Sequence, residues 1–233
     1  GEAGLQLLTK GKAMNPTPAQ QLLVQQAARA LGKARLVHAY GHCSLRLDET
    51  HFLVCAAMPM GMIGEEPGTV VPVSGPLPEG VLGEVRAHQA IYARRGDVQG
   101  ICRIMPPALI ALSTQGIVPQ PRHGIGAYFH PGPALWDDPR LLRDDESAAR
   151  LADALGDLNT IVMRGNGAIV VAEALEKAVA LSWFLEDAAR VERDVRAMGF
   201  DPPRGLDADE IAARQVWAGG VVERMWQYLT MRI

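Results

Sequence analysis

The centre of the chain reads Gly100-Ile101-Cys102-Arg103-Ile104-Met105-Pro106-Pro107. Residues 98–104 are mostly apolar and predict a buried strand. The two prolines end this strand, because proline has no backbone N–H to give to a sheet. Alternate side chains of a strand point to the same side. The strand end therefore presents the guanidinium of Arg103 and the thioether of Met105 on one face.

A helix is expected immediately before this strand. A loop marked by prolines and glycines over residues 76–83 leads into a helical pattern over residues 84–94. Glu84 and His88 are four residues apart on it, so the two side chains can share one face. A further helix is expected over residues 108–115, directly after the double proline.

The remaining segments alternate between strand and helix patterns. Strands are expected at 41–46, 52–55, 69–73, 160–163 and 168–171, with turns at 48–50 and 164–167. Helices are expected at 17–32, 144–155, 175–198 and from 207 to 225 or beyond, whereas 58–68 and 119–133 resemble loops. This order predicts one α/β domain, with a mixed or mostly antiparallel central sheet flanked by helices.

Composition excludes several classes of function. The chain has 233 residues, 48% of them hydrophobic, and a formal net charge of -3, which disfavours nucleic acid as a partner. No apolar run reaches the roughly 18–20 residues that span a bilayer, so no membrane segment is expected. Three cysteines without paired spacing favour a reducing, cytoplasmic location. Residues 1–13 resemble a leader before a natural start at Met14.

Four segments in this order resemble the class II aldolase/adducin family. The matching sequences are Gly41-His42-Cys43-Ser44-Leu45-Arg46 for G-N-[IL]-S-x-R, 84–88 followed by Ile91-Tyr92 for E-x-x-x-H, 103–107 for H-x-H-P-P, and 163–171 for the L-R-[NG]-H-G hairpin. The resemblance implies an α/β/α class II aldolase-like domain at 14–200. It leaves 201–233 as a helical extension that packs on its own or a neighbouring subunit. It also implies a homotetramer whose sites lie between subunits.

The resemblance also implies where a metal would bind. In catalytic members, the two histidines of H-x-H and one from the hairpin, often with a glutamate, hold a divalent ion that polarises a substrate oxygen. Here those three positions carry Arg103, Met105 and Asn166. Arginine stays protonated, a thioether is a soft ligand, and an amide oxygen is a weak one. We therefore predict no divalent metal and no other cofactor.

A metal-free lyase, either a decarboxylase or a retro-aldolase acting on a small organic acid, fits these residues. Arg103 would hold the carboxylate or the developing enolate, although it could instead only pair with Glu84. Glu84 would act as acid and base. His88 completes the predicted catalytic group, although a structural hydrogen bond is its commoner role. The predicted substrate-binding residues are His42, Ser44, Met105, Arg164 and Asn166.

Two other functions remain open from the sequence. One is a non-catalytic ligand-binding or association module, as in adducin, which a closed cleft filled by Met105 and an Arg103–Glu84 pair would favour. The other is an unusual metal enzyme with His42, Glu84 and His88 as ligands. Methionines also gather in the 58–62 loop, where they could line an apolar pocket, although core packing is their commoner role.

Overall fold

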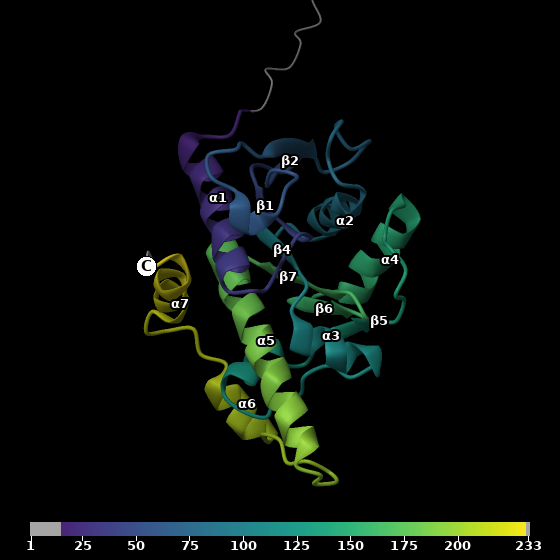
Figure 1. Ribbon diagram of the computed structural model, residues 1–233, viewed down its shortest axis with the longest axis vertical. Helices are drawn as coiled ribbons and strands as arrows, with labels where there is room; N and C mark the ends of the chain where they lie inside the picture. The colour runs from purple at the N-terminus through teal and green to yellow at the C-terminus, as the bar shows by residue number, and fades with distance from the viewer. Residues whose placement is uncertain (1–14, 232–233) are drawn as a thin grey trace, which may run out of the picture.

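The computed structural model describes residues 15–231 and has a seven-stranded sheet at its centre (Figure 1). The strand order is β3-β2-β1-β4-β7-β6-β5, and every pair is antiparallel except β5 with β6. The strands are β1 (His42–Arg46), β2 (His51–Val54), β3 (Thr69–Pro72), β4 (Gly100–Ile104), β5 (Ala134–Trp136), β6 (Thr160–Met163) and β7 (Gly167–Ala172). The predicted mostly antiparallel sheet is confirmed, and the proposed leader at 1–13 lies outside the described residues.

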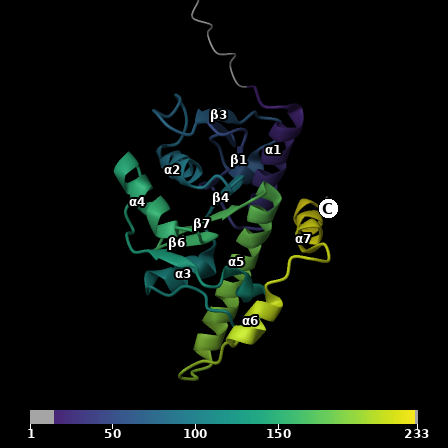
Figure 2. The same ribbon diagram turned by 180° about the vertical axis from the view of Figure 1, so that it is seen from behind.

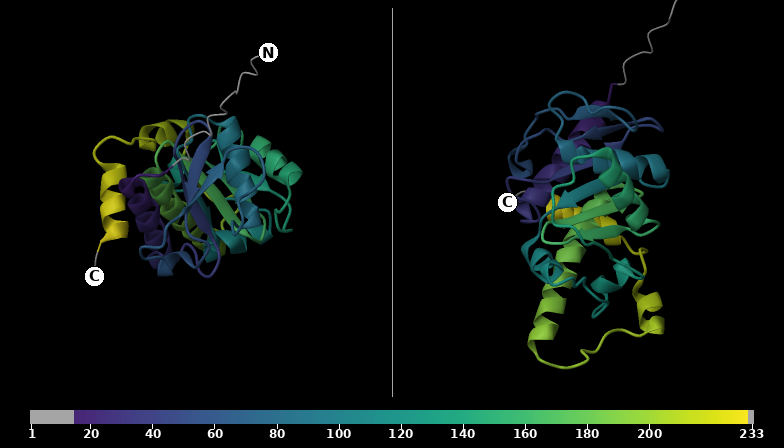
Figure 3. Two further views of the ribbon diagram at one scale, coloured as in Figure 1. Left: turned by 90° about the horizontal axis from the view of Figure 1, so that it is seen from above. Right: turned by 90° about the vertical axis from the view of Figure 1, so that its right-hand side faces the viewer.

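Helices cover both faces of this sheet and make an α/β/α arrangement. One face carries α1 (Pro18–Lys33), α3 (Pro107–Thr114) and α5 (Leu175–Ala197), and the other carries α2 (Arg86–Arg94) and α4 (Asp145–Leu155). The view from above shows the sheet between these layers, with α7 (Val221–Thr230) outermost beside α1 (Figure 3). The view from behind shows α6 (Ala208–Arg214) against the lower half of α5 (Figure 2). None of the helices within 15–231 is long and apolar enough to cross a membrane.

Strand alternation divides the core into two clusters and decides where the site lies. On β4, Cys102 and Ile104 belong to the cluster beneath α1 and α5, whereas Ile101 belongs to the cluster beneath α2 and α4. Arg103 shares the face of Ile101 because the two residues are two positions apart. The side chain of Arg103 therefore lies on the α2 side of the sheet.

Local sequence signals explain several element ends. Thr17 caps α1 in a reciprocal capping box with Gln20, and Asp144 caps α4 through the Ser147 N–H. The β6–β7 turn needs a glycine at its last position. Gly167 has a φ of +102°, and a Cβ there would collide with the Ile104 carbonyl. This close approach packs the hairpin turn against the end of β4.

Some expected elements differ from the structure. The single helix expected from 207 onward is wrong: α6 ends at Arg214, and α7 begins only after Gly219 and Gly220, whose φ values of +85° and +73° are not helical. The short parallel strand β5 was not expected at all. In the 58–62 loop, Met60 is fully buried in the core whereas Met62 is 70% exposed, so these methionines do not form one pocket lining.

Candidate functional site

The pairing of β1 with β4 brings the first site residues together. In this register His42 lies directly opposite Arg103, so both side chains share the α2 face of the sheet. Ser44 follows two residues later on β1 and points the same way. Helix α2 covers this face and supplies His88 and Tyr92, which are four residues apart and therefore on one side of the helix.

These four side chains form a continuous buried chain of hydrogen bonds. Nδ1 of His42 and Nε2 of His88 lie 2.7 Å apart, and Nδ1 of His88 lies 2.6 Å from Oγ of Ser44. The Ser44 hydroxyl also lies 2.8 Å from the Tyr92 hydroxyl. The Phe52 ring stacks on the His88 ring at 6.1 Å with an interplanar angle of 12°, which fixes the plane of the imidazole. Each polar group is therefore held by at least one partner.

Burial sets the charge of the two imidazoles. Burial, helped by the positive charge of Arg103, lowers the pKa of His42 from 6.5 to about 3. Burial and then the neighbouring His42 lower the pKa of His88 well below its usual value, although Glu84 opposes this. Burial raises the pKa of Tyr92 above its usual value. Both histidines and the tyrosine are therefore neutral near pH 7.

Arg103 is the largest fully buried side chain of the described residues, and it is charged. Its Nε donates to Glu84 in an ion pair, and its Nη1 donates to the Ile104 carbonyl at 2.7 Å. A Cβ at position 167 would lie 2.9 Å from Nη1, so glycine at this position leaves room for the guanidinium. Within 15–231, Nη2 makes no hydrogen bond, which leaves it available to a ligand.

A very small cavity borders the site. His42 lines it together with Cys55 of the β2 end and Leu82 and Val85 before α2. Its volume is about 10 Å³, which is room for about one water molecule. This cavity is therefore too small for an organic molecule.

The other predicted binding residues lie around the end of β4. Met105 follows the strand directly and is half-buried, with its N–H donating to the Leu36 carbonyl. Asn166 lies in the hairpin turn next to the glycine that contacts Arg103. Arg164 forms an ion pair with Asp137 after β5, so its guanidinium is already partnered.

Tyr92 is the member of the hydrogen-bond chain that the sequence prediction missed. Its signal was its place one helical turn after His88, in the Ile91-Tyr92 segment already used for the family resemblance. Nothing in the sequence alone says that a serine on β1 links the two residues, because that link needs the packing of α2 on the sheet.

The donor set fits a divalent metal poorly. No group of three or more His, Cys, Asp or Glu within 15–231 is placed to hold a metal ion. Both ring nitrogens of His88 are already in hydrogen bonds, and Nδ1 of His42 is used as well. At the strand end, the Arg103 guanidinium has no lone pair to give. The side chains present thus supply positive charge where the family resemblance implied a cation.

The chain is similar in sequence to proteins named as decarboxylases. It is 28% identical over 178 residues to a 3,4-dihydroxyphthalate decarboxylase of Arthrobacter keyseri, covering 68% of this chain and 71% of the relative. It is 25% identical over 217 residues to a 3,4-dihydroxyphthalate decarboxylase of Terrabacter sp. (strain DBF63), covering 84% and 88%. These similarities support a lyase-like role.

Solved structures agree on the fold. An aldolase II superfamily protein from Pseudomonas syringae aligns with a TM-score of 0.80 at 24% identity, covering 92% of both chains. An L-fuculose 1-phosphate aldolase from Glaciozyma antarctica PI12 aligns with a TM-score of 0.77 at 20% identity, covering 93% of both chains. Residues 23–192 match the family described as Class II Aldolase and Adducin N-terminal domain. The chain therefore belongs to the class II aldolase and adducin N-terminal domain family.

Proposed function

We propose that this protein is a lyase, in first place a decarboxylase, that acts on a small organic carboxylate without a divalent metal. The observation that carries the proposal is the buried Arg103 cation, which stands at a family ligand position beside Glu84 and opposite His42. A fixed guanidinium can take the electrostatic role of a metal toward a carboxylate or an enolate oxygen. The similarity to 3,4-dihydroxyphthalate decarboxylases favours an aromatic acid over a sugar phosphate.

Arg103 would stabilise the charge that develops as the carbon–carbon bond breaks. The bond to the carboxylate carbon breaks, carbon dioxide leaves, and the electron pair moves into the remaining conjugated system. An enolate or phenolate oxygen of that system would accept a hydrogen bond from Nη2, the guanidinium nitrogen that makes no hydrogen bond within 15–231. The Ile104 carbonyl, which accepts from Nη1, keeps the guanidinium in place whether or not Glu84 carries a proton, so no reorganisation is needed during the step.

Glu84 would return a proton to the carbon that lost carbon dioxide. Its side chain is 19% exposed, so it can exchange protons with solvent, whereas Arg103 is only 2% exposed. In its acid form the carboxyl group would protonate that carbon, which completes the replacement of carbon dioxide by hydrogen. In a retro-aldol reaction the same carboxylate would instead take the proton from the substrate hydroxyl.

The remaining residues would bind and orient the acid. His42 reaches the small cavity, while His88 and Ser44 hold His42 in place. Met105 and Asn166 border the end of β4 and would contact the apolar and polar edges of the ligand. Arg164 would add a further positive charge at the outer edge, although its bond to Asp137 must first open.

Release of carbon dioxide from 3,4-dihydroxyphthalate tests the proposal. We expect turnover by the purified protein that is unchanged after treatment with a strong chelator. The Glu84→Gln variant should lose at least about 100-fold in kcat, the usual size of a general-acid contribution. The exposed Glu79→Gln in the preceding loop is the matched control. Full turnover by the Glu84→Gln variant would remove the acid/base role, and loss of activity with the chelator would contradict a metal-free reaction.

A non-catalytic ligand-binding or association module is the second candidate. The cavity of about 10 Å³ and the closed Arg103–Glu84 pair favour it. It predicts no turnover of any tested acid, with no loss of ligand binding in the Glu84→Gln variant.

Elemental analysis of the untagged protein tests the third candidate, a metal enzyme using His42, Glu84 and His88. Stoichiometric zinc, iron or manganese would favour that candidate over both others.

A further inference from the structure

We propose that Tyr92, Ser44 and His88 fix His42 in a single neutral tautomer that presents an Nε2–H donor to the cavity. The donor would bind an oxygen of an anionic ligand, beside the guanidinium of Arg103. The tautomer is inferred from the hydrogen-bond chain alone. Only the identity of the ligand as an organic acid rests on the proposed function.

The argument begins with counting protons along the chain. Three hydrogen bonds link four groups, and each bond needs one proton between its two atoms. A neutral imidazole has one N–H and one acceptor nitrogen. A ring that accepts a hydrogen bond on one side therefore donates one on the other side. A serine hydroxyl, in contrast, can either pass the direction on or accept from both neighbours. The bonds therefore run from Tyr92 to His42, from His42 to Tyr92, or from both ends toward Ser44.

The protons of the two hydroxyl groups decide among these three arrangements. Within 15–231, the Tyr92 hydroxyl has no hydrogen-bond partner except Ser44, and the Tyr92 side chain is only 2% exposed. If the bonds ran toward Tyr92, its own proton would have no acceptor in a buried site, at a cost of about 1–3 kcal/mol. If His88 and Tyr92 both donated to Ser44, the Ser44 proton would lack an acceptor in the same way, because Ser44 is fully buried and its hydroxyl lies against these two residues. If Tyr92 donates to Ser44 and Ser44 donates to His88, both hydroxyl protons have an acceptor.

The favoured direction gives each histidine a defined tautomer. Ser44 donates to Nδ1 of His88, so His88 must carry its proton on Nε2. That N–H donates to Nδ1 of His42, so His42 must also carry its proton on Nε2. Burial keeps both rings neutral, since the pKa of each is lowered. His42 is thus a hydrogen-bond donor at its free edge rather than a base.

That free edge is open to a ligand. Within 15–231, His123 Nδ1 and Thr160 Oγ1 are the fully buried side-chain nitrogen or oxygen atoms that lack a partner. Nε2 of His42 has no partner and is not among them, so it reaches accessible space, and His42 lines the cavity. Arg103 lies opposite His42 across the β1–β4 pair. Nη2 of Arg103, which makes no hydrogen bond within 15–231, would be the second donor beside this position.

This arrangement selects for ligands with oxygen acceptors. A carboxylate offers two oxygens, and a neighbouring enolate or phenolate oxygen offers a third, whereas an amine or a neutral N–H group would face donors only. A neutral imidazole N–H also stabilises a developing oxyanion without changing the net charge of the site. Tyr92 and Ser44 are positioning residues here, because they act on the ligand only through His88 and His42.

Nitrogen NMR of the ¹⁵N-labelled full chain tests the tautomer, because protonated and unprotonated imidazole nitrogens have well-separated shifts. We expect His42 and His88 to be both in the Nε2–H form at pH 7. In Ser44→Ala, the His42–His88 bond can run either way, so His42 should become a mixture of tautomers. Ser44→Thr keeps the hydroxyl and should restore the single form. A His42 ring protonated at Nδ1 in the unmodified protein would overturn the proposal.

Tyr92→Phe is the matched variant, because it keeps the aromatic ring in the core and removes only the hydroxyl that donates to Ser44. It removes one bond, but Ser44 can still donate to His88, so the Nε2–H form should persist. If Tyr92→Phe and Ser44→Ala both leave a single tautomer, the chain does not set it and the proposal fails. Circular dichroism confirms that each variant is folded before its spectrum is compared.

Titration with phthalate tests the ligand class separately. Phthalate should shift the Nε2–H resonance of His42 in the unmodified protein and in Ser44→Thr, and shift it less in Ser44→Ala. A single Nε2–H tautomer without a phthalate effect would refute the ligand class while leaving the tautomer standing. Absence of turnover on 3,4-dihydroxyphthalate together with a phthalate shift would refute the decarboxylase but keep the anion-binding donor pair.

Discussion

Arg103 shows how much one residue changes a family site. A buried guanidinium is stable only where carboxylate or carbonyl groups compensate its lost hydration. Here Glu84 supplies the charge and the Ile104 carbonyl supplies a second acceptor. The sequence predicted that Arg103 would either hold a ligand or pair with Glu84, and the structure has the pair. The guanidinium keeps Nη2 for a ligand, so pairing and binding are compatible.

Removing the cation should destabilise the fold. In Arg103→Met the Glu84 carboxylate loses its partner, and breaking a buried pair from one side costs about 3 kcal/mol or more. Urea unfolding at pH 7.5 measures this change in free energy. The double variant Arg103→Met with Glu84→Gln should regain part of the loss, because no charge remains unpaired.

A matched control separates this effect from the loss of any arginine. Arg164→Met removes the partner of Asp137, which is 72% exposed, and such surface pairs contribute roughly 0–1 kcal/mol. Equal losses in Arg103→Met and Arg164→Met would mean that burial of the Arg103 pair has no energetic consequence.

The buried histidines should make stability fall in mild acid. The folded-state pKa of His42 is about 3 and its ordinary value is 6.5, so between these values the unfolded chain binds more protons. The stabilising contribution is therefore complete above about pH 6.5 and is lost as the pH falls toward 3. His88 acts in the same direction. At pH 5, His42 alone should cost about 2 kcal/mol, on the order of 1.4 kcal/mol per pH unit.

Urea unfolding at pH 7.5 and pH 5 checks this prediction. His42→Asn cannot titrate in this range, so its stability should change less between the two pH values than that of the unmodified protein. His130→Asn serves as the control because His130 is exposed. If both variants keep the full pH dependence, titration of other groups would explain it.

At the scale of elements, the sequence predicts most of the fold because the signals are local. The Thr17 cap, the Asp144 cap and the glycine turn at 164–167 each act within a few residues. The final helix was mispredicted because its apolar pattern continues across Gly219 and Gly220. Strand β5 escaped prediction because three residues pair with β6 in a stretch without periodicity.

The candidate site was predictable only in part, for a related reason. Arg103, Glu84 and His88 were found because each stands in a sequence motif. The ties from Ser44 to His88 and Tyr92, and from Arg164 to Asp137, join residues at least 27 positions apart. Such contacts depend on how α2 and β5 pack on the sheet, and no local pattern encodes that packing.

A carboxylate from α5 holds the start of α3, and its removal should have a measurable cost. Glu186 is 3% exposed and accepts from the N–H groups of Ala108 and Leu109 at 3.1 and 2.9 Å. A negative charge at a helix N-terminus also complements the helix dipole. Helix α3 follows the Arg103 strand directly, so this contact also anchors the site. We expect Glu186→Gln to lose about 1–3 kcal/mol of unfolding free energy.

Urea unfolding at neutral pH measures the Glu186 effect. The control is Asp194→Asn, which removes an exposed carboxylate from the same helix and should change stability by less than about 0.5 kcal/mol. If both variants lost a similar amount of unfolding free energy, the hydrogen bonds from Glu186 to the start of α3 would not contribute to stability.

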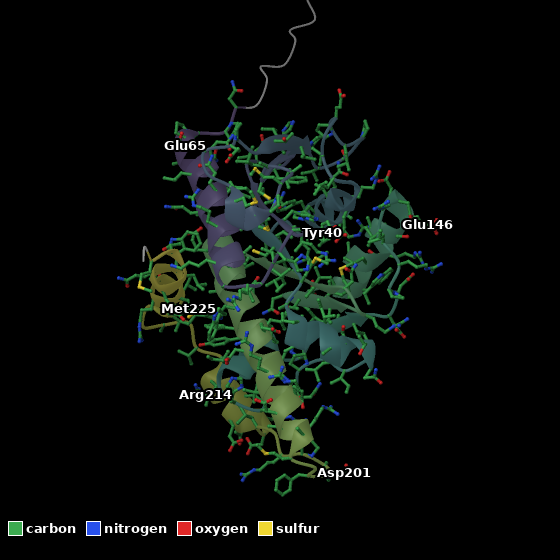
Figure 4. The ribbon with its side chains drawn as sticks, in the orientation of Figure 1. Tyr40, Glu65, Glu146, Asp201, Arg214 and Met225 are labelled. Atoms are coloured by element: carbon green, nitrogen blue, oxygen red, sulfur yellow. The ribbon has the colours of Figure 1, made fainter. Side chains whose placement is uncertain are left out.

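At the scale of the molecule, the C-terminal segment packs on its own subunit. Helix α7 lies against α1 and α5, and Trp217, Met225 and Trp226 pack on the core (Figure 4 labels Met225). Packing of the C-terminal extension on a neighbouring subunit stays a prediction beside these contacts with the same chain. The cavity at His42 is too small for the proposed ligand. We infer that a neighbouring subunit completes the binding site.

The family resemblance implies four subunits, so we predict a homotetramer of about four times the 25.1 kDa chain mass, measured by sedimentation velocity. Tyr40 stands two residues before His42 and its large aromatic ring is 69% exposed (Figure 4). If a neighbour covers it, Tyr40→Glu should shift the protein toward smaller species, because burying a charge there is costly. Phe200→Glu is the control, since Phe200 is 71% exposed beyond the end of α5. A tetramer that survives Tyr40→Glu, or one that Phe200→Glu dissociates equally, would place the subunit contact away from His42.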